Sequence, residues 1–333
     1  MGSLLFTKFV GVISMLLVFA RAGCPFTAIY GFGDSLSVVD HLASAFHLPS
    51  PKPYLQKDKA YGVNFAAPGA TALNSSFFET REIFKLFSNN NTLDGQIEQF
   101  MTYLDTICSS HHGCVKKLKH AVFLVGEFGA NDYSNAIFQG KQLEEVDYYV
   151  TPVVKSIKDA VKNLIEAGAV NLVVPGILPL GCLPSYLTMF HDDDPMSYDS
   201  KKCLRSFNTF AMLHNDHLQQ ALTNLRVEYP HVQIVYASYY KAFTALLHYH
   251  DLLGFEKGSL TKACCGTGGL YNFDAMKMCG SEGVSVCSDQ TKYVHWDGFH
   301  LTEEAYIHMV EGFISGNFVY PKLKLRDRRL CIM

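Results

Sequence analysis

The chain has 333 residues, of which 48% are hydrophobic and 18% are charged. This apolar fraction can bury a sizeable core, which excludes a mainly disordered chain. The 28 Lys and Arg residues against 31 Asp and Glu residues give a net charge of −3, so nothing indicates a nucleic-acid partner.

The first 22 residues predict a secretory signal peptide. Lys8 gives a short basic start, residues 9–20 are almost wholly apolar, and Ala20-Arg21-Ala22 has the small-x-small pattern of a cleavage site. The alternative is a transmembrane anchor, which a run of 12 apolar residues does not favour because a bilayer needs roughly 20. We therefore predict a mature chain that begins at Gly23 and is secreted, to the extracellular space, the cell wall or the vacuole, without a stable membrane anchor.

All ten cysteines lie beyond this segment, and an oxidising compartment favours disulfides between them. One expected local bridge joins Cys108 and Cys114 across a short loop, and another joins Cys182 and Cys203 across a Pro- and Asp-rich loop. A further group lies in a Gly-rich stretch, and its pairing cannot be deduced from sequence. A zinc site is the alternative for that group, although secretion favours disulfides and no metal. Its members are Cys264, Cys265, Cys279 and Cys287, and Cys24 and Cys331 remain near the two ends.

Two sequons agree with secretion. Asn74 and Asn90 each begin an Asn-x-Ser/Thr pattern, which is the acceptor for N-glycosylation in secreted proteins. A three-residue pattern also occurs by chance, so these predictions depend on the signal peptide.

Short apolar runs alternate with helical patterns along the chain. Continuous apolar runs suit parallel strands that are buried on both faces. The alternation predicts an α/β fold with a doubly wound, flavodoxin-like parallel sheet flanked by helices. We expect one domain over residues 23–320, followed by a basic tail over residues 321–333. The expected strands are residues 28–32, 121–125, 170–174 and 232–236, and the clearest helices are residues 151–167 and 207–229.

A serine follows the first of these strands. Gly33-Asp34-Ser35 places Ser35 at a glycine turn just past residues 28–32, and active sites in such sheets lie beyond the carboxyl ends of the strands. A serine nucleophile needs a base and donors for the oxyanion that forms on the attacked carbonyl. Gly, Asp and Ser are also ordinary turn residues, so this motif alone is weak evidence.

A candidate base lies near the C-terminus. His300 could accept the Ser35 proton through one ring nitrogen, while Asp297, three residues earlier, could hold the other nitrogen. The alternative is a helix start, with Thr302 or Asp297 as the cap of a helix over residues 303–313. Both interpretations can hold together.

Two further loops offer oxyanion donors. Asn131 follows the strand at residues 121–125, and its side-chain amide could donate to an oxyanion. Gly69 lies in a loop where the missing side chain allows the backbone N–H to approach a substrate. The alternative for both motifs is a plain turn or loop.

Taken in order, the four motifs resemble those of the GDSL-type esterases and lipases of the SGNH hydrolase superfamily, particularly the large plant group. The resemblance covers nearly all of the mature chain and implies the SGNH hydrolase fold. It also implies that Ser35 is the nucleophile, His300 the base and Asp297 its orienting partner. The oxyanion hole would be formed by the Ser35 N–H, the Gly69 N–H and the Asn131 side chain. The block at residues 295–302 is most similar to the branch that contains acetylajmalan esterase-like proteins.

One departure from the plant group follows the nucleophile. Family members usually continue with Ser-Asp-Thr-Gly-Asn and a long stretch that leads into a helix. Here Ser37 is followed directly by residues 38–43, which resemble the start of that helix. The chain therefore resembles a family member that lacks an internal segment, and the turn after Ser35 has to be rebuilt.

These features predict a secreted serine ester hydrolase, a carboxylesterase or lipase, that forms an acyl-enzyme on Ser35 and needs no cofactor. Its substrate would be a small-molecule or lipid ester whose acyl and alcohol groups the sequence does not identify. One alternative is an acyltransferase with the same triad. The other is a catalytically impaired, secreted binding protein, which the shortened region after Ser35 would favour.

Overall fold

The computed structural model describes residues 26–57, 59–85 and 91–323. The predicted signal peptide, Cys24, Asn90, Cys331 and residues 324–333 of the basic tail lie outside these ranges. Within the described ranges, no helix combines the length and the apolar character that crossing a membrane requires.

Five parallel strands form the centre of the main sheet, in the order β3-β1-β4-β5-β6. Numbered among themselves along the chain, they have the order 2-1-3-4-5 of the flavodoxin-like fold, so the predicted fold class is confirmed. All four predicted strands are present, two with the expected bounds and two displaced by one residue. The strands are β1 (Ala28–Phe32), β3 (Gly62–Asn64), β4 (Ala121–Val125), β5 (Asn171–Pro175) and β6 (Gln233–Ala237).

Short strands complete the sheet at both edges. β2 (Lys52–Pro53) adds in parallel to β3, and β9 (Val319–Tyr320) adds antiparallel to β6. A separate antiparallel pair joins β7 (Cys265–Gly266) and β8 (Ser285–Val286).

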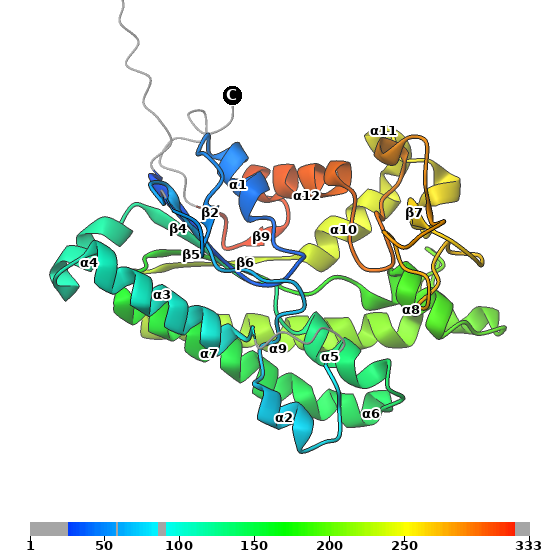
Figure 1. Cartoon of the computed structure of the whole chain (residues 1–333), viewed down its shortest axis with the longest axis horizontal. Helices are drawn as coiled ribbons and strands as arrows, with labels where there is room; N and C mark the ends of the chain where they lie inside the picture. Colours follow the sequence, from blue (N-terminus) through cyan, green and yellow to red (C-terminus); the bar gives the residue numbers. More distant parts are fainter. Residues whose placement is uncertain (1–25, 58, 86–90, 324–333) are drawn as a thin grey trace, which may run out of the picture.

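Helices cover both faces of the sheet (Figure 1). One face carries α1 (Val39–Ala45), α10 (Tyr239–His248) and α12 (Glu303–Ser315). The other carries α3 (Leu93–Ile107), α7 (Val150–Ala167) and α9 (Arg205–Glu228), which are longer. The shorter helices are α2 (Ser75–Glu79), α4 (His111–Leu118), α5 (Ala130–Ile137), α6 (Leu143–Val146), α8 (Pro184–Met189) and α11 (His250–Leu253), with 3₁₀ turns η1 (Asp147–Tyr149), η2 (Leu180–Cys182), η3 (Pro195–Ser197), η4 (Lys257–Ser259) and η5 (Gln290–Lys292).

Aromatic packing fixes the strand that leads to Ser35. Tyr30 of β1 stacks on Phe123 of β4 with ring centroids 5.1 Å apart, and Phe32 stacks on Phe65 at the same distance. Phe100 of α3 packs edge-on against these rings. Burial of each such ring stabilises the fold by roughly 1.5–3 kcal/mol, so β1 offers a rigid base for the turn that follows it.

Four disulfides are present among the described residues. Cys108–Cys114 and Cys182–Cys203 pair as expected. The group whose pairing was open forms Cys264–Cys287 and Cys265–Cys279. These four sulfurs are bonded to one another, so the zinc alternative for this group is wrong. The segment between Cys108 and Cys114 is a loop only as far as Ser110, because α4 begins at His111.

Candidate active site

Ser35 lies on a tight connection between β1 and α1. Gly33 has φ of +141°, and a Cβ at that position would lie 2.6 Å from the Gly126 carbonyl oxygen, so a larger residue does not fit. Asp34 and Leu36 are buried on either side of Ser35, and Asp34 Oδ1 accepts the Leu36 N–H at 2.8 Å. The Ser35 side chain, between these two buried residues, is exposed.

His300 and Asp297 meet Ser35 from the other end of the chain. His300 Nε2 lies 2.8 Å from Ser35 Oγ, and His300 Nδ1 lies 2.8 Å from Asp297 Oδ2. Asp297 Oδ1 also accepts the backbone N–H groups of Phe299 at 2.7 Å and His300 at 2.8 Å. The carboxylate therefore holds both the loop and the imidazole, and the three side chains have the connectivity of a serine-histidine-aspartate triad.

Electrostatics favour a charged imidazole in this site. Burial would lower the pKa of His300, but the hydrogen bond to Asp297 and the negative charges of Asp297 and Asp34 outweigh it, so the pKa is raised above its ordinary value. Burial would raise the pKa of Asp297, and the His300 hydrogen bond and charge reverse this, so that pKa is lowered. Such a pair stabilises the imidazolium that forms when a serine hydroxyl gives up its proton.

Thr302, the other cap candidate, begins α12. Its hydroxyl accepts the Ala305 N–H at 3.3 Å. Asp297 instead accepts N–H groups of Phe299 and His300, in the loop before the helix. Of the two cap predictions, Thr302 is therefore confirmed and Asp297 is wrong, because the carboxylate faces His300 instead.

Asn131 lies across the strand switch point from Ser35. It follows β4 in the first turn of α5, and its Nδ2 donates to Asp34 Oδ2 at 2.6 Å and to the Ala70 carbonyl at 3.2 Å. Asn131 thus contacts both the nucleophile turn and the residue after Gly69.

Gly69 is the third residue of a β-turn over residues 67–70. The Ala70 N–H donates to the Ala67 carbonyl at 3.1 Å, and Gly69 has φ of +70°, as a type II turn with proline before glycine requires. The buried Asp132 anchors the chain beyond this turn, since its two oxygens accept the N–H groups of Ala72 and Leu73, each at 2.9 Å.

Two supporting residues escaped the sequence analysis. Gln96 of α3 clamps Gly33, accepting its N–H at 2.9 Å and donating to its carbonyl at 2.8 Å. The signal was a polar residue on the buried face of α3, beside Leu93 and Ile97. Glu127, which lies just past β4, is fully buried.

Glu127 and Asp34 form a buried carboxyl pair beneath Ser35. Burial raises the pKa of Asp34 to about 6, and burial together with the Asp34 charge raises the pKa of Glu127 well above its ordinary value. Because the charge of Asp34 contributes to the raised pKa of Glu127, the two carboxyl groups disfavour being ionised together. Asp34 Oδ2 accepts the hydrogen bond from Asn131 Nδ2 at 2.6 Å.

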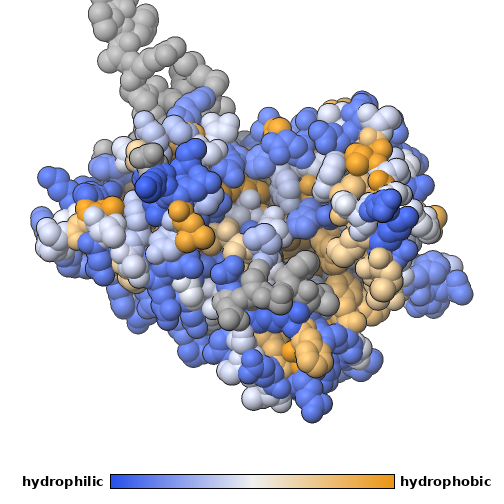
Figure 2. Space-filling model, in the orientation of Figure 1, coloured by the Kyte–Doolittle hydropathy of each residue, from blue (hydrophilic) through white to orange (hydrophobic). Residues whose placement is uncertain are grey.

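An apolar pocket of about 260 Å³ opens beside the loop of His300. Phe299, the residue before His300, contributes one wall. Figure 2 shows apolar side chains gathered in a hollow between α5 and the region of β7. The other lining residues come from α8, the end of α5 and the loop between β7 and β8; they are Phe138, Ser185, Met189, Phe273, Ala275 and Met278.

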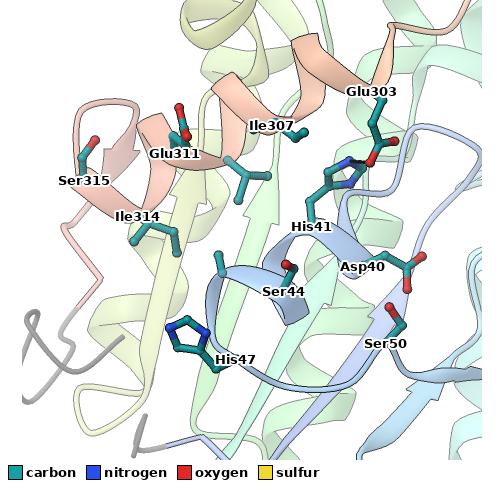
Figure 3. Close-up of a pocket in the computed structure, with 12 residues that line it drawn as sticks. Asp40, His41, Ser44, His47, Ser50, Glu303, Ile307, Glu311, Ile314 and Ser315 are labelled. Carbon is teal, nitrogen blue, oxygen red and sulfur yellow. Dashed lines mark ion pairs between the residues drawn. The ribbon is translucent and has the colours of Figure 1, made fainter. Parts of the chain in front are cut away.

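A larger groove of about 810 Å³ separates α1 from α12. His41 of α1 points across it toward Glu303 of α12, with His41 Nε2 3.2 Å from Glu303 Oε1 (Figure 3). Ser35, Asp297 and His300 line neither this groove nor the apolar pocket. Its polar lining includes Asp40, Ser44, His47, Ser50, Glu311 and Ser315.

The first sequon is accessible. Asn74 is exposed and caps α2, where its Oδ1 accepts the Phe77 N–H at 3.2 Å and the Ser76 hydroxyl at 2.8 Å. Its glycosylation stays a prediction.

Comparisons with known proteins agree with this geometry. The family described as GDSL-like Lipase/Acylhydrolase matches residues 26–313. A GDSL esterase/lipase of Arabidopsis thaliana is 44% identical over 300 residues, which cover 90% of this chain and 91% of that protein. Acetylajmalan esterase of Rauvolfia serpentina is 35% identical over 359 aligned positions, which cover 93% and 92% of the two chains. Sinapine esterase of Brassica napus is 37% identical over 293 residues, covering 86% and 75%. The chain belongs to the GDSL-like lipase/acylhydrolase family and is a hydrolase of carboxylic esters.

Proposed function

We propose that the protein is a secreted serine esterase that forms an acyl-enzyme on Ser35. The observation that carries this proposal is the continuous chain of hydrogen bonds from Ser35 Oγ through both nitrogens of His300 to Asp297, each link 2.8 Å long. A serine hydroxyl is a weak nucleophile without an adjacent base, and this arrangement supplies one.

In the proposed reaction, Ser35 Oγ attacks the ester carbonyl and passes its proton to His300 Nε2. The N–H groups of Ser35 and Gly69 and the Asn131 amide stabilise the oxyanion. His300 then protonates the leaving alcohol, and water attacks the acyl-enzyme with His300 again as the base. His300 finally returns the proton of that water to Ser35 Oγ as the acyl–oxygen bond breaks and the carboxylic acid leaves.

We further propose that residues 23–320 form one secreted hydrolase domain after removal of residues 1–22, and that Asn74 and Asn90 carry glycans. The four disulfides support export, because such bonds persist in oxidising compartments. The substrate is a small-molecule or lipid ester.

Turnover of p-nitrophenyl acetate tests the proposed activity. The wild type should hydrolyse this ester, and Ser35→Ala should lose on the order of 10⁴-fold or more in kcat. Ser37→Ala, the same change two residues away, is the matched control and should retain activity within a few fold. A folded wild type without turnover would overturn the proposal and favour a binding protein with a defective turn after Ser35.

A further inference from the structure

We propose that the apolar pocket beside Phe299 binds one uncharged hydrocarbon group of the ester, either a single aromatic ring or a short alkyl chain. This inference rests on the proposed function and extends it to the class of substrate. The pocket is identified by its connection to the proposed base, by its lining and by its volume.

The connection runs through the loop that carries Asp297 and His300. Phe299 lies between them in sequence, and its N–H is bound by Asp297 Oδ1 at 2.7 Å. Gly298 allows Phe273 to pack directly on this loop, because a Cβ at Gly298 would lie 2.2 Å from Phe273 Cε2. The pocket wall and the loop are therefore one packed unit.

A second wall belongs to the helix of the proposed oxyanion donor. Phe138 directly follows α5, the helix whose first turn contains Asn131. Its ring packs edge-on against Phe299 with centroids 5.9 Å apart. Phe273 also packs edge-on against Phe299, with centroids 5.7 Å apart. The pocket is thus bounded by the two elements that carry His300 and Asn131, while neither of these residues lines it. We therefore assign the pocket to a group of the ester that extends away from Ser35.

The lining selects for an uncharged group. Six of the seven lining side chains are apolar, the seventh is the Ser185 hydroxyl, and none of the seven is charged. Moving a charged group from water into such surroundings is costly when no partner compensates it. A neutral hydrocarbon instead gains roughly 0.8 kcal/mol for each buried methylene.

The volume limits the size of that group. A dry apolar cavity of about 150 Å³ holds benzene, and a pocket for a complete drug-sized ligand has about 300–1,000 Å³. The 260 Å³ pocket therefore fits a ring or a short chain and leaves the rest of the ester outside. Met189 and Met278, which are 46% and 37% exposed, form part of the lining, and their flexible side chains can adjust to the bound group.

Two series of esters that share methyl acetate as their reference test the pocket. The acyl series is methyl acetate, butyrate, hexanoate and benzoate, and the alcohol series is the acetates of methanol, butanol, hexanol and benzyl alcohol. In one of the two series, kcat/KM should rise by about 10-fold or more from methyl acetate to the best substrate. The series that rises tells whether the pocket takes the acyl group or the alcohol.

Ala275→Phe fills the pocket and should remove most of that rise, lowering the ratio of kcat/KM for the best ester to that for methyl acetate by about 10-fold. Met276→Phe is the matched control, because Met276 is the next residue, is 93% exposed and does not line the pocket. It should keep the wild-type ratio. Met278→Phe fills the pocket from another position and replaces Ala275→Phe if that variant does not fold.

The outcomes separate this inference from the proposed function. Turnover of methyl acetate with no rise in either series, or a rise that survives both filling variants, would overturn the pocket assignment and leave the esterase intact. No turnover of any ester by the folded wild type would overturn both.

Discussion

Two hollows are lined by residues close to His300 in the sequence, and they differ in size and in chemistry. The groove between α1 and α12, which Glu303 lines, has about three times the volume of the pocket that Phe299 lines. The groove combines charged and polar side chains with the apolar Ala45, Ile307, Val310 and Ile314, whereas the pocket is almost wholly apolar. Yet His300 directs its Nε2 at Ser35, while His41, one of the two histidines that line the groove, pairs with Glu303.

The comparison shows that volume does not identify the substrate site here. What distinguishes the smaller hollow is that Phe299 in its wall belongs to the loop that carries Asp297 and His300. In the groove His41 pairs with Glu303, whereas the Ser35 hydroxyl pairs with His300, so the proton of Ser35 has its acceptor in His300. Four predictions test this distinction, from the largest expected effect to the smallest.

Asp297→Asn tests the loop that separates the two hollows. The amide keeps an oxygen for the N–H groups of Phe299 and His300 but removes the charge that stabilises the imidazolium. We expect kcat for p-nitrophenyl acetate to fall on the order of 10⁴-fold. Steady-state kinetics with circular dichroism as the folding control measure this, and a loss below 10-fold would contradict the role of Asp297.

Asn131→Ala tests the proposed oxyanion donor on α5, the helix that Phe138 follows. Loss of one oxyanion donor should lower kcat by about 10²–10³-fold and leave KM nearly unchanged, because the interaction forms only in the transition state. The same kinetics decide it. A change confined to KM would show that Asn131 binds the ground state instead.

The pH profile tests the electrostatics at His300. In the proposed mechanism neutral His300 is the base. Because its pKa is raised, kcat/KM should rise with pH along an acid limb whose midpoint lies above the ordinary histidine value of about 6.5. Below that midpoint the rate should fall about 10-fold for each pH unit. In Asp297→Asn the residual activity should have its limb at lower pH, because the carboxylate charge is gone. A wild-type midpoint well below 6.5 would contradict the assignment.

His41→Gln tests the larger hollow and has the smallest expected effect. The His41–Glu303 pair is partly exposed, with 18% and 70% of the two side chains accessible, and such pairs contribute about 0–1 kcal/mol. We expect kcat/KM within about 2-fold of wild type for every ester in both series. A loss above 10-fold, or a changed preference along either series, would make the groove the substrate site and reverse the comparison.

The sequence predicted four of the five central strands, all but β3, and the meeting of its motifs, because both follow from local pattern. Buried parallel strands are continuous apolar runs, and residues after β1 and β4 must meet at the carboxyl edge of the sheet. This reasoning placed Ser35 and Asn131 together without any knowledge of side-chain contacts. The edge strand β9 was missed because a strand of two residues has no periodicity.

The residues that support the turns around Ser35 and Gly69 could not be predicted, because their role depends on contacts of single side chains between distant parts of the sequence. Gln96 reaches Gly33 across 63 residues, and Asp132 reaches Ala72 across 60. Glu127 interacts through its charge with Asp34, which is distant in the sequence, and no spacing rule reports such an interaction. The pairing of Cys264 with Cys287 was open for the same reason, since spacing alone allowed other partners.

The shortened connection after Ser35 stays a prediction. The alignment with acetylajmalan esterase has 359 positions, more than the 333 residues of this chain, so that relative has residues without a counterpart here. In this chain the connection is held by the Asp34 bond to the Leu36 N–H, and the Tyr239 hydroxyl lies 3.5 Å from the Leu36 carbonyl. These contacts give Ser35 a defined position beside His300.

Labelling with a fluorophosphonate tests most directly whether that serine is an activated nucleophile. Intact-mass spectrometry of the folded protein should show one adduct, and peptide mapping should place it on Ser35, with no adduct on Ser35→Ala and normal labelling of Ser37→Ala. An unlabelled folded wild type, or an adduct at another residue, would contradict the account.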